Sequence, residues 1–298
     1  MANPLEYARA KSRFVRRLLR HRLHHQPKVC PYCGPSSALR LMRHKKLIMD
    51  ILECDTCRLI FRWPVDTPQE HDTHYQHEYF VDAPQVVLPA PQELQALTNR
   101  CFAGSHLDLN PKIRLLKTLR PAGRVLDFGC SWGYGIYQLR SHGYDATGFE
   151  ISKPRAEYAR QQLKMKVFGS IDELQALPPG SFDIIFSNHV VEHLPNISDA
   201  LRLMARLLVP GGLAFHVLPN FTGATARTGI WLKWIGEDHP IAPTIAFFEY
   251  AIPRSGLERP LFASSPFNEE LAMALNTQPA MPRSVDGDEL LVVAYKAA

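Results

Sequence analysis

Four cysteines near the N-terminus stand in two close pairs, Cys30 with Cys33 and Cys54 with Cys57. Two intervening residues in each pair let both sulfurs point at one ion, and two such pairs complete a tetrahedron of thiolates. Disulfides would suit a secreted chain, and a redox role would need only one pair. The spacing therefore predicts a structural zinc ion with no coordination position open to a substrate.

A second candidate for chemistry is VLDFGCSWGYG, residues 125–135. It continues an apolar run into a glycine turn, which is how a nucleotide pocket begins in a parallel α/β sheet. Gly129 allows a sharp turn and Gly133 a close approach of helix and ligand, but Tyr134 replaces the third glycine of a dinucleotide loop. Asp127 is poorly placed for a diphosphate and well placed for a cation, so the loop favours a ligand with an α-amino group and a sulfonium centre.

Glu150 ends the next predicted strand, 21 residues after Gly129. At that distance a carboxylate can accept hydrogen bonds from both hydroxyls of an adenosyl ribose. A ligand with one ribose, an adenine, no phosphates and a cationic amino-acid tail is S-adenosylmethionine. Ser131 is expected to be the N-cap of the helix that follows the loop.

The elements that must position these groups alternate along the second half of the chain. Apolar strands alternate with helical segments, and the predicted strands are residues 124–129, 145–151, 166–170, 182–188, 213–220 and 289–297. Strands that are apolar throughout, with helices between them, predict a mostly parallel sheet that is covered on both faces. The predicted fold class is doubly wound α/β.

Four runs, VLDFGCSWGYGIYQL, GFEIS, FDIIFSNHVVEHL and LVPGGLAFHVLPN, resemble the class I S-adenosylmethionine-dependent methyltransferases in order and spacing, over about residues 112–220. The cysteine pairs followed by LIFRWP and HYQHEYF look like the methyltransferases with an N-terminal zinc ribbon, several of which act on sugars or small metabolites. The resemblance implies a Rossmann-like sheet preceded by a small zinc-ribbon module. It implies methyl transfer to a small-molecule acceptor such as a sugar or a natural-product intermediate.

The resemblance also implies roles at individual positions. Glu150 should bind the ribose and Ile151 should pack on the adenine, while Asn188 should line the pocket near the methyl group. The methionine end should be held by the loop residues Asp127, Gly129, Cys130, Ser131 and Gly133. The adenine edge should be contacted by Ser170 and Ile171. We interpret Cys130 as a buried loop residue and not as a nucleophile.

Three histidines are candidates for catalysis: His189, His193 and His239. Methyl transfer requires donor and acceptor to be held in line, and a general base only for a weakly acidic hydroxyl or carbon. His239 lies in EDHPIAPTIAFF, which resembles the family's segment over the acceptor, and it is the best candidate for a base or acceptor contact. His193 has the alternative of a capping or core histidine.

Two departures from the family pattern concern the loop and the C-terminal part. The family usually has glycine where Ser131 stands, and residues 249–283 are rich in proline and lack the clear helix and strand expected there. The predicted division of the chain is a basic amphipathic helix, a zinc ribbon, a connector of helices and loops, and a methyltransferase domain, at 1–28, 29–64, 65–111 and 112–298.

Positive charge gathers at the front of the chain. Residues 1–63 hold 14 Lys and Arg against 4 Asp and Glu, whereas the remainder holds 20 against 25. The basic helix could lie on RNA, on a membrane or on the protein's own body, and the last is favoured. An RNA methyltransferase is the alternative enzyme, but few aromatics are suited to stacking bases, and SNHVVEH replaces an Asn-Pro-Pro-Tyr-like motif. A non-catalytic scaffold that binds the cofactor is a third hypothesis.

No apolar run approaches the roughly 18 residues of a membrane span. The basic N-terminus lacks the apolar block of a secretory signal. We therefore expect a cytoplasmic enzyme, with its oligomeric state left open.

Overall fold

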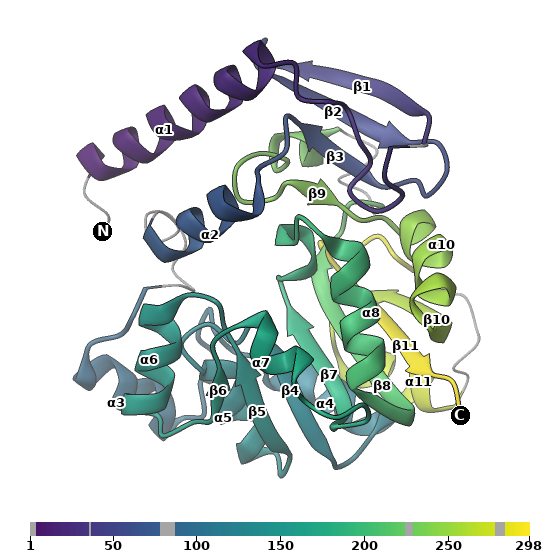
Figure 1. Ribbon diagram of the computed structural model, residues 1–298. Helices are drawn as coiled ribbons and strands as arrows, with labels where there is room; N and C mark the ends of the chain where they lie inside the picture. The colour runs from purple at the N-terminus through teal and green to yellow at the C-terminus, as the bar shows by residue number, and fades with distance from the viewer. Residues whose placement is uncertain (1–3, 36, 78–86, 224–228, 278–283) are drawn as a thin grey trace.

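The computed structural model describes residues 4–35, 37–77, 87–223, 229–277 and 284–298. Two β-sheets lie one above the other in Figure 1, a small antiparallel sheet at the top and a larger, mostly parallel sheet below it. From the sequence, Tyr79 and Phe80 could belong to the front wall of the acceptor site or to the core, with core favoured for Phe80; both lie outside the described residues.

The larger sheet has seven strands in the order β10-β11-β8-β7-β4-β5-β6. Its strands are β4 (Arg124–Phe128), β5 (Asp145–Phe149), β6 (Val167–Phe168), β7 (Phe182–Asn188), β8 (Leu208–Pro219), β10 (Leu257–Ser264) and β11 (Glu289–Lys296). Strand β11 is antiparallel to both of its neighbours, β10 and β8. The pairs from β8 through β7, β4 and β5 to β6 are all parallel. This confirms the predicted doubly wound, Rossmann-like sheet, whose strand order reverses direction between β4 and β7.

Helices cover both faces of this sheet. Along β7, Ile184 and Phe186 belong to the core on one face and Ile185 to the core on the other, because successive side chains of a strand point to opposite faces. One face carries α4 (Asn110–Leu119), α5 (Tyr134–Ser141), α6 (Lys153–Gln162) and α11 (Glu269–Thr277), and the other carries α7 (Ile171–Gln175), α8 (Ile197–Leu207) and α10 (Ile245–Ser255). Burial on both faces explains why the strands are apolar throughout.

The expectation that residues 249–283 lack a clear helix and strand is wrong for the described part of that segment. Helix α10 is capped at its start by the Thr244 hydroxyl, which accepts a hydrogen bond from the Phe247 amide, and at its end by Gly256. Pro253 stands in its last turn, close to the Gly256 cap, so the hydrogen bond that its missing amide cannot donate is lost at the end of the helix and not in its middle. Pro260 falls where the β10–β11 register shifts, an irregularity that accommodates a proline.

The small sheet draws its strands from distant parts of the sequence. Its order is β1-β2-β3-β9, made by β1 (Leu39–Lys45), β2 (Met49–Cys54), β3 (Ile60–Trp63) and β9 (Ile241–Ala242). Strand β9 pairs with β3 through Ile60 with Ala242 and Phe61 with Ile241. The cysteine-bearing sheet is therefore completed by residues from beyond β8, and the predicted domain boundary at residue 64 stays a prediction.

Two of the remaining helices connect the sheets. The polar sequence of residues 65–110 predicts mostly loop, with a helix over about 92–101. The structure has α3 (Pro91–Asn99) at the predicted place, and a further helix, α2 (Pro68–His77), where loop was expected. Thr67 and Glu70 explain α2, since the Thr67 amide donates to Glu70 Oε2 at 2.9 Å and the Glu70 amide to Thr67 Oγ1 at 3.3 Å. This reciprocal pair is a capping box, and Pro68 at the first position fits it.

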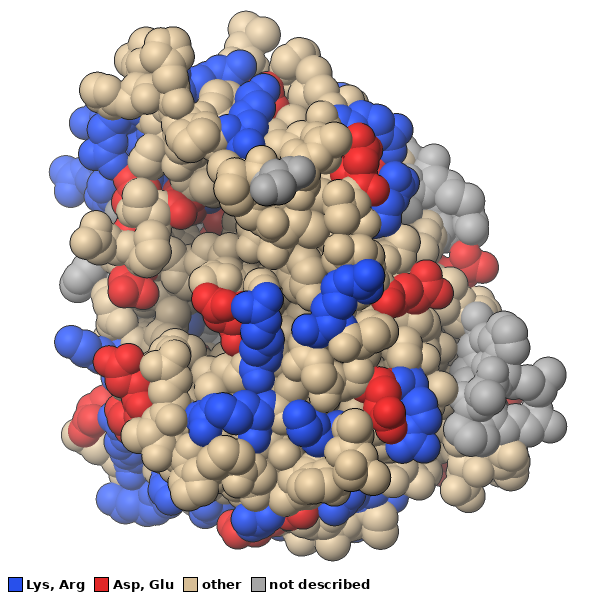
Figure 2. All heavy atoms as spheres, turned by 45° about the vertical axis from the view of Figure 1, so that its right-hand side comes forward, with Lys and Arg blue, Asp and Glu red and all other residues tan. Residues whose placement is uncertain are grey.

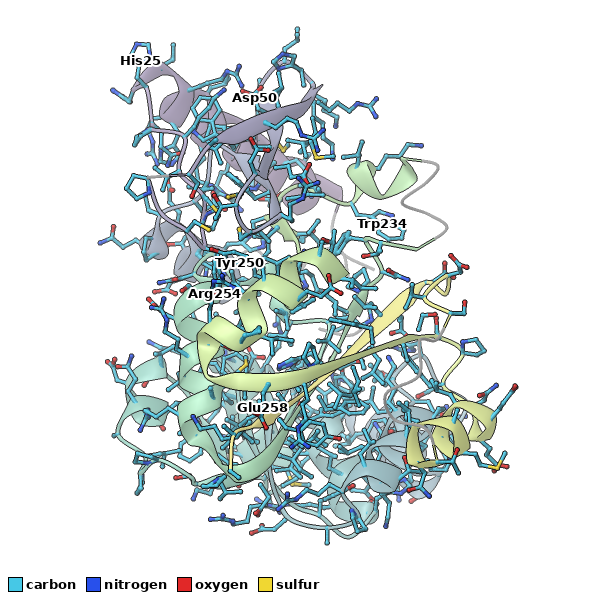
Figure 3. All side chains as sticks on the ribbon, turned by 90° about the vertical axis from the view of Figure 1, so that its right-hand side faces the viewer. His25, Asp50, Trp234, Tyr250, Arg254 and Glu258 are labelled. Atoms are coloured by element: carbon cyan, nitrogen blue, oxygen red, sulfur yellow. The ribbon has the colours of Figure 1, made fainter. Side chains whose placement is uncertain are left out.

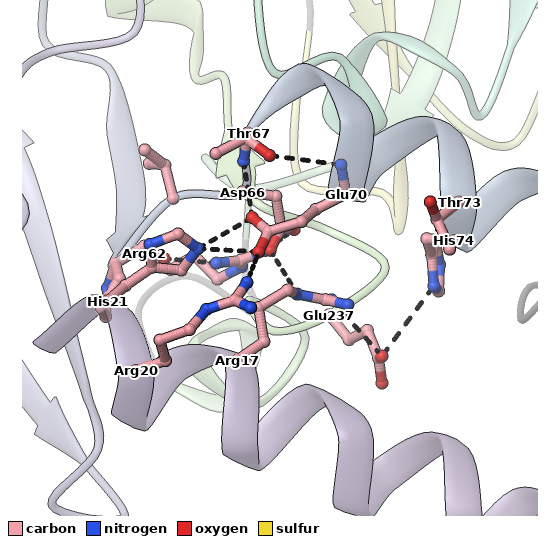
Figure 4. A network of polar contacts seen from close by, with 12 residues as sticks. Arg17, Arg20, His21, Arg62, Asp66, Thr67, Glu70, Thr73, His74 and Glu237 are labelled. Carbon is pink, nitrogen blue, oxygen red and sulfur yellow. Dashed lines mark hydrogen bonds and ion pairs between the residues drawn. The ribbon is translucent and has the colours of Figure 1, made fainter.

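The basic helix α1 (Pro4–Leu23) packs on the protein's own body, as favoured from the sequence. Phe14 and Leu18 are buried in its contact face, while Val15 and Leu19 are exposed. Arg17 Nε lies 2.8 Å from Asp66 Oδ1, and the buried guanidinium of Arg62 pairs with the same carboxylate (Figure 4). None of the described helices combines the length and the hydropathy that crossing a membrane requires.

Helix α10 supports the first cysteine pair from below. The ring of Tyr32, which stands between Cys30 and Cys33, lies edge-on to Phe247 with centroids 5.3 Å apart, and its hydroxyl donates to the Ala251 carbonyl at 3.3 Å. Tyr250 lies on the same helix next to Arg254, whose guanidinium carbon is 3.8 Å from the ring centroid (Figure 3). The two sheets are thus packed together through α10.

Candidate active site at the carboxyl edge of the sheet

A cavity of about 1210 Å³ lies at the carboxyl ends of the parallel strands. Its floor includes Gly129 and Glu150, and its other walls come from α1, α2 and the segment before β9. The floor adjoins the point between β4 and β7 where strand order reverses, which is where doubly wound sheets bind ligands. The cavity therefore joins the predicted cofactor loop to the N-terminal part of the chain.

The glycines of the loop are required by its geometry. Gly129 has φ +83°, and a Cβ there would lie 2.5 Å from Val190 Cγ2; Gly133 has φ +93°. Gly135, which was not among the predicted site residues, lies against the acid at the strand end, because a Cβ would approach Asp127 Oδ2 to 2.3 Å. The sequence could have indicated Gly135 as a site residue, because it follows Gly133 by only two positions.

Ser131 differs from its predicted role. Helix α5 begins at Tyr134 with Gly133 as the N-cap residue, so Ser131 does not cap it. Instead Ser131 takes φ +50°, the left-handed conformation that glycine adopts most easily. Its backbone amide donates to Glu150 Oε2 at 3.0 Å. The serine thus keeps the backbone shape of the glycine that the family usually has here, and the loop is tied to the second strand.

Cys130 is buried, with its sulfur packed so closely on β5 that a Cβ at Gly148 would lie 2.4 Å away. Burial and the nearby Asp127 raise the pKa of its thiol well above the usual value. A thiol that stays protonated and enclosed is not a nucleophile.

Two buried carboxyls lie beneath the loop. Glu150 accepts hydrogen bonds from the Ser131 amide and, at 2.7 Å, from the Ser152 amide, and Arg155 Nη1 lies 3.9 Å from it. Burial raises the pKa of Glu150. Burial, and then the charge of Glu150, raise the pKa of Asp127 to about 7. Glu150 lines the cavity and Asp127 lies buried beneath its floor, so the charge close to the floor depends on pH.

The raised pKa of Asp127 predicts pH-dependent cofactor binding. Below about pH 7 this carboxyl is protonated and attracts a cationic amino group less, so affinity for S-adenosylhomocysteine should be about tenfold lower at pH 6 than at pH 8. By the same shift, stability of the ligand-free protein falls as pH rises from about 4 to about 7, since the unfolded chain ionises first. For wild type and Asp127→Asn, titration calorimetry measures the affinity for S-adenosylhomocysteine and scanning calorimetry measures the stability of the ligand-free protein. If the variant showed the same pH dependence as wild type, the raised pKa would not belong to Asp127.

The predicted adenine side is only partly assembled at the cavity. Ile151 and Ile171 line it, but Ser170 does not; its hydroxyl caps α7 by accepting from the Glu173 amide. Gln76 of α2, which was not predicted, donates to the Ile151 carbonyl at 2.6 Å and accepts from the Lys153 amide at 3.1 Å. Helix α2 is therefore fastened over the segment that follows Glu150.

The three predicted catalytic histidines surround a carboxylate that was not predicted, Glu192 in the short 3-10 helix Val191–His193. The distances to Glu192 Oε1 are 3.5 Å from His189 Nδ1, 3.7 Å from His193 Nε2 and 4.0 Å from His239 Nε2. Although burial opposes ionisation, His189 and then His193 lower the pKa of Glu192 to about 2. Burial lowers the pKa of His193 to about 4, so its ring is neutral at pH 7.

A second polar network holds the end of β7. Lys112 Nζ donates to Asn188 Oδ1 at 2.7 Å and to Glu289 Oε1 at 2.6 Å, and His189 Nε2 lies 2.7 Å from the same Glu289 oxygen. Burial opposes charge on His189, but the nearby carboxylates of Glu192 and Glu289 raise its pKa to about 9. Lys112 and Glu289 come from α4 and β11, so no local sequence pattern joined them to the site.

The four predicted metal ligands form one cluster in the small sheet. The sulfurs of Cys30, Cys33, Cys54 and Cys57 all lie within 4.8 Å of one another, and Cys30 Sγ is 3.6 Å from Cys57 Sγ. Four sulfurs bound to one ion at about 2.3 Å would be about 3.8 Å apart. The cluster therefore has the donor set and nearly the spacing of a four-thiolate metal centre.

The central part of this chain is similar in sequence to known methyltransferases. Residues 126–216 match the profile of the family described as "Methyltransferase domain". The Ubiquinone biosynthesis O-methyltransferase of Xanthomonas campestris is 33% identical over 110 residues, which cover 35% of this chain and 46% of that protein. The Malonyl-[acyl-carrier protein] O-methyltransferase of Erwinia pyrifoliae is 34% identical over 133 residues, covering 43% and 50%. The matches span about half the length of these relatives.

Among solved structures, a chain from the complex of the Haloferax volcanii Trm112 methyltransferase activator with a methyltransferase matches with a TM-score of 0.50. The two share 17% identity, and the match covers 70% of this chain and 98% of that chain. At this identity the likeness concerns the fold alone. Together with the strand order, it identifies the seven-stranded sheet as the α/β Rossmann-like methyltransferase fold.

Proposed function

We propose that this chain, with its methyltransferase domain at residues 126–216, transfers a methyl group from S-adenosylmethionine to a small-molecule acceptor bound in the cavity. The observation that carries the proposal is the cavity itself, which joins the glycine loop and Glu150 to His193 and His239 in one space. The two relatives are named as O-methyltransferases, which favours an oxygen acceptor here.

The residues on the cavity floor fit the proposed cofactor. Gly129 lines the cavity without a side chain, Gly133 allows α6 to pack closely on the loop through Ala159, and the buried carboxylate of Glu150 lines the cavity. Asp127 supplies negative charge for a cationic amino-acid tail. When bound, S-adenosylmethionine supplies an activated methyl group, and the protein's task is then orientation and exclusion of water. Ile151 and Ile171 offer apolar surface for an adenine.

The acceptor side of the cavity is assigned to the histidine cluster and α2. Tyr75 packs its ring near His193, with centroids 6.3 Å apart, and both line the cavity. His193 is neutral at pH 7 and so has a lone pair for an acceptor proton. His239, with a side chain about 25% exposed, borders the same space. These contacts support a catalytic or positioning role for both histidines.

Replacing His239 by asparagine should slow transfer on the order of 100-fold, the lower range for loss of a general acid–base group, while S-adenosylhomocysteine affinity changes little. The assay follows tritiated methyl transfer to a panel of phenols, sugar nucleotides and carboxylic acids, with calorimetry for the cofactor. His106→Asn is the matched control, because His106 also lines the cavity but does not belong to the Glu192, His193 and His239 cluster. Equal losses in both variants would remove His239 from the site.

The four-cysteine cluster is proposed to hold structural zinc. All four donors come from cysteine, three of them buried, and the cluster lies in the small sheet, with none of its members lining the 1210 Å³ cavity. A site without an open position suits a structural ion. It stabilises the sheet that provides one wall of the cavity.

The RNA alternative is less well supported, because the basic side chains of α1 are largely engaged within the protein. Lys11 lies 3.2 Å from Glu237, Arg22 lies 3.3 Å from Asp50, and Arg20 pairs with Glu70. On the face drawn in Figure 2, Lys and Arg side chains stand among Asp and Glu side chains and form no single stripe. A phosphate backbone needs clustered positive charge.

The proposal as a whole is tested by calorimetry and acceptor profiling. S-adenosylhomocysteine should bind one site per chain, and tritium should move to a small molecule of the panel. Failure to bind S-adenosylhomocysteine would overturn the proposal, and so would methylation of bulk RNA in place of the small molecules.

A further inference from the structure

A second group of metal-ligand residues, separate from the four cysteines, lies at the cavity wall, where His193 and His239 line the cavity and Glu192 is buried directly behind them. Glu192, His193 and His239 each place one ligand atom within 4.8 Å of the others. Glu192 and His193 directly follow β7, at the point where strand order reverses, and His239 arrives from the segment before β9. The three residues thus converge from two parts of the chain on one point of the cavity wall.

The carboxylate at the centre of this group is unusual because the described residues leave it unsatisfied. The side chain of Glu192 is 0% exposed, and neither oxygen accepts a well-formed hydrogen bond from any described residue; the nearest donor, His189 Nδ1, is 3.5 Å away. Burying a carboxylate without hydrogen bonds is unfavourable, because the charge loses its solvation and gains nothing in return. A cation between Glu192 and the imidazoles would satisfy it.

We propose that Glu192, His193 and His239 bind one divalent transition-metal ion at the acceptor end of the cavity. Two imidazoles and a carboxylate suit manganese, iron, cobalt or zinc better than magnesium, which prefers oxygen ligands. Ligand atoms around one ion with bonds of about 2.0–2.2 Å lie roughly 3–3.6 Å apart. The separations of 3.7 and 4.0 Å from Glu192 Oε1 need only a small contraction.

His189 completes the surroundings of the site. Its Nδ1 is 3.5 Å from Glu192 Oε1, and its Nε2 lies 2.7 Å from Glu289 Oε1. Side chains that contact a metal-binding carboxylate from outside the ligand set fix its orientation, and His189 has this position beside Glu192. His189 also has φ +54°, an uncommon conformation for a residue other than glycine, so its backbone is held in a strained form at this point.

An ion at this point would narrow the class of acceptor, an inference that rests on the proposed methyl transfer. A bound cation lowers the pKa of an oxygen attached to it. The site therefore favours acceptors whose hydroxyl can reach the ion, such as phenols, enols or vicinal diols, over amine acceptors. With the ion bound, the lone pairs of His193 and His239 are used by the metal, and the two histidines act as ligands.

The experiment measures metal binding directly, without an acceptor. Wild-type protein with its four-cysteine centre loaded with zinc is titrated with Mn²⁺ alone, and binding is followed by electron paramagnetic resonance and elemental analysis. One Mn²⁺ per chain is expected in addition to one zinc. His239→Ala and Glu192→Gln should weaken Mn²⁺ binding on the order of 100-fold or more, because losing a ligand exceeds the about 10- to 100-fold effect of losing an outer-shell partner.

The control removes an exposed histidine elsewhere: His24→Ala should bind Mn²⁺ as wild type does. His239→Ala, on a partly exposed side chain, keeps the test valid if the buried Glu192 variant fails to fold. Unchanged Mn²⁺ binding in His239→Ala, or no Mn²⁺ bound at millimolar concentration, would overturn the metal site. Calorimetry with S-adenosylhomocysteine on the same samples reports separately on the proposed function.

Discussion

Replacing Glu150 with alanine is expected to weaken S-adenosylhomocysteine binding on the order of 100-fold or more. The proposed pair of hydrogen bonds between this carboxylate and the ribose hydroxyls would be lost, and hydrogen bonds to a charged group contribute about 1.5–3 kcal/mol each. The amides of Ser131 and Ser152 also lose their acceptor, so the glycine loop loses its tie to the second strand. Cofactor affinity by calorimetry is the measurement.

Two further variants make this prediction specific. Glu157→Ala removes an exposed carboxylate from α6, seven residues away, and should leave affinity unchanged. Glu150→Gln keeps one acceptor oxygen and should lie between wild type and alanine. The unfolding temperature is recorded for each protein, because a loss of affinity that merely follows a loss of folded protein would not support a ribose contact.

Changing Cys54 to serine should release the metal of the four-cysteine cluster and unfold the small sheet. Structural zinc in small modules contributes apparent binding free energies of about 10–16 kcal/mol, and Cys54 is fully buried at the end of β2. Because that sheet carries β9 and supports the wall next to His239, methyl transfer should be lost with it. The cofactor loop belongs to the other sheet, so S-adenosylhomocysteine binding should persist.

The matched control for this prediction is Cys101→Ser, a cysteine that is free and lies outside the cluster. Metal content by elemental analysis and the far-ultraviolet circular dichroism spectrum are compared for the three proteins. Full retention of the metal and of thermal stability in Cys54→Ser would refute the four-thiolate centre.

The parts that were predictable from the sequence are those whose signal is local. The strands around Val125 and Ile184 are apolar throughout, and the glycines near Asp127 follow a strand directly, so both the sheet and the loop could be inferred. Helix α2 had a local signal as well, the capping box from Thr67 to Glu70, but its polar sequence obscured it. The proline content of residues 249–283 argued wrongly against α10 and β10. Pro253 lies in the last turn of the helix and Pro260 at an irregularity of the strand, so neither interrupts the middle of its element.

The remainder depends on contacts between distant segments. Glu192 was overlooked because the sequence gives no reason for a glutamate in a short 3-10 turn to point inward among histidines. Lys112 and Glu289 meet at Asn188 across 177 positions of sequence. Ser131 was expected to cap a helix because serine commonly does so, whereas the chain uses it in a left-handed conformation.

The pairing of β3 with β9 has a consequence for how the protein is made. Strand β9, at Ile241–Ala242, is synthesised about 180 residues after β3, so the edge of the small sheet stays open on the ribosome until most of the chain has emerged. An open strand edge is a template for association with other chains, and contacts so distant in sequence slow folding. A fragment ending near residue 64 should therefore self-associate even when its cysteines are loaded with metal, and the full-length chain should not.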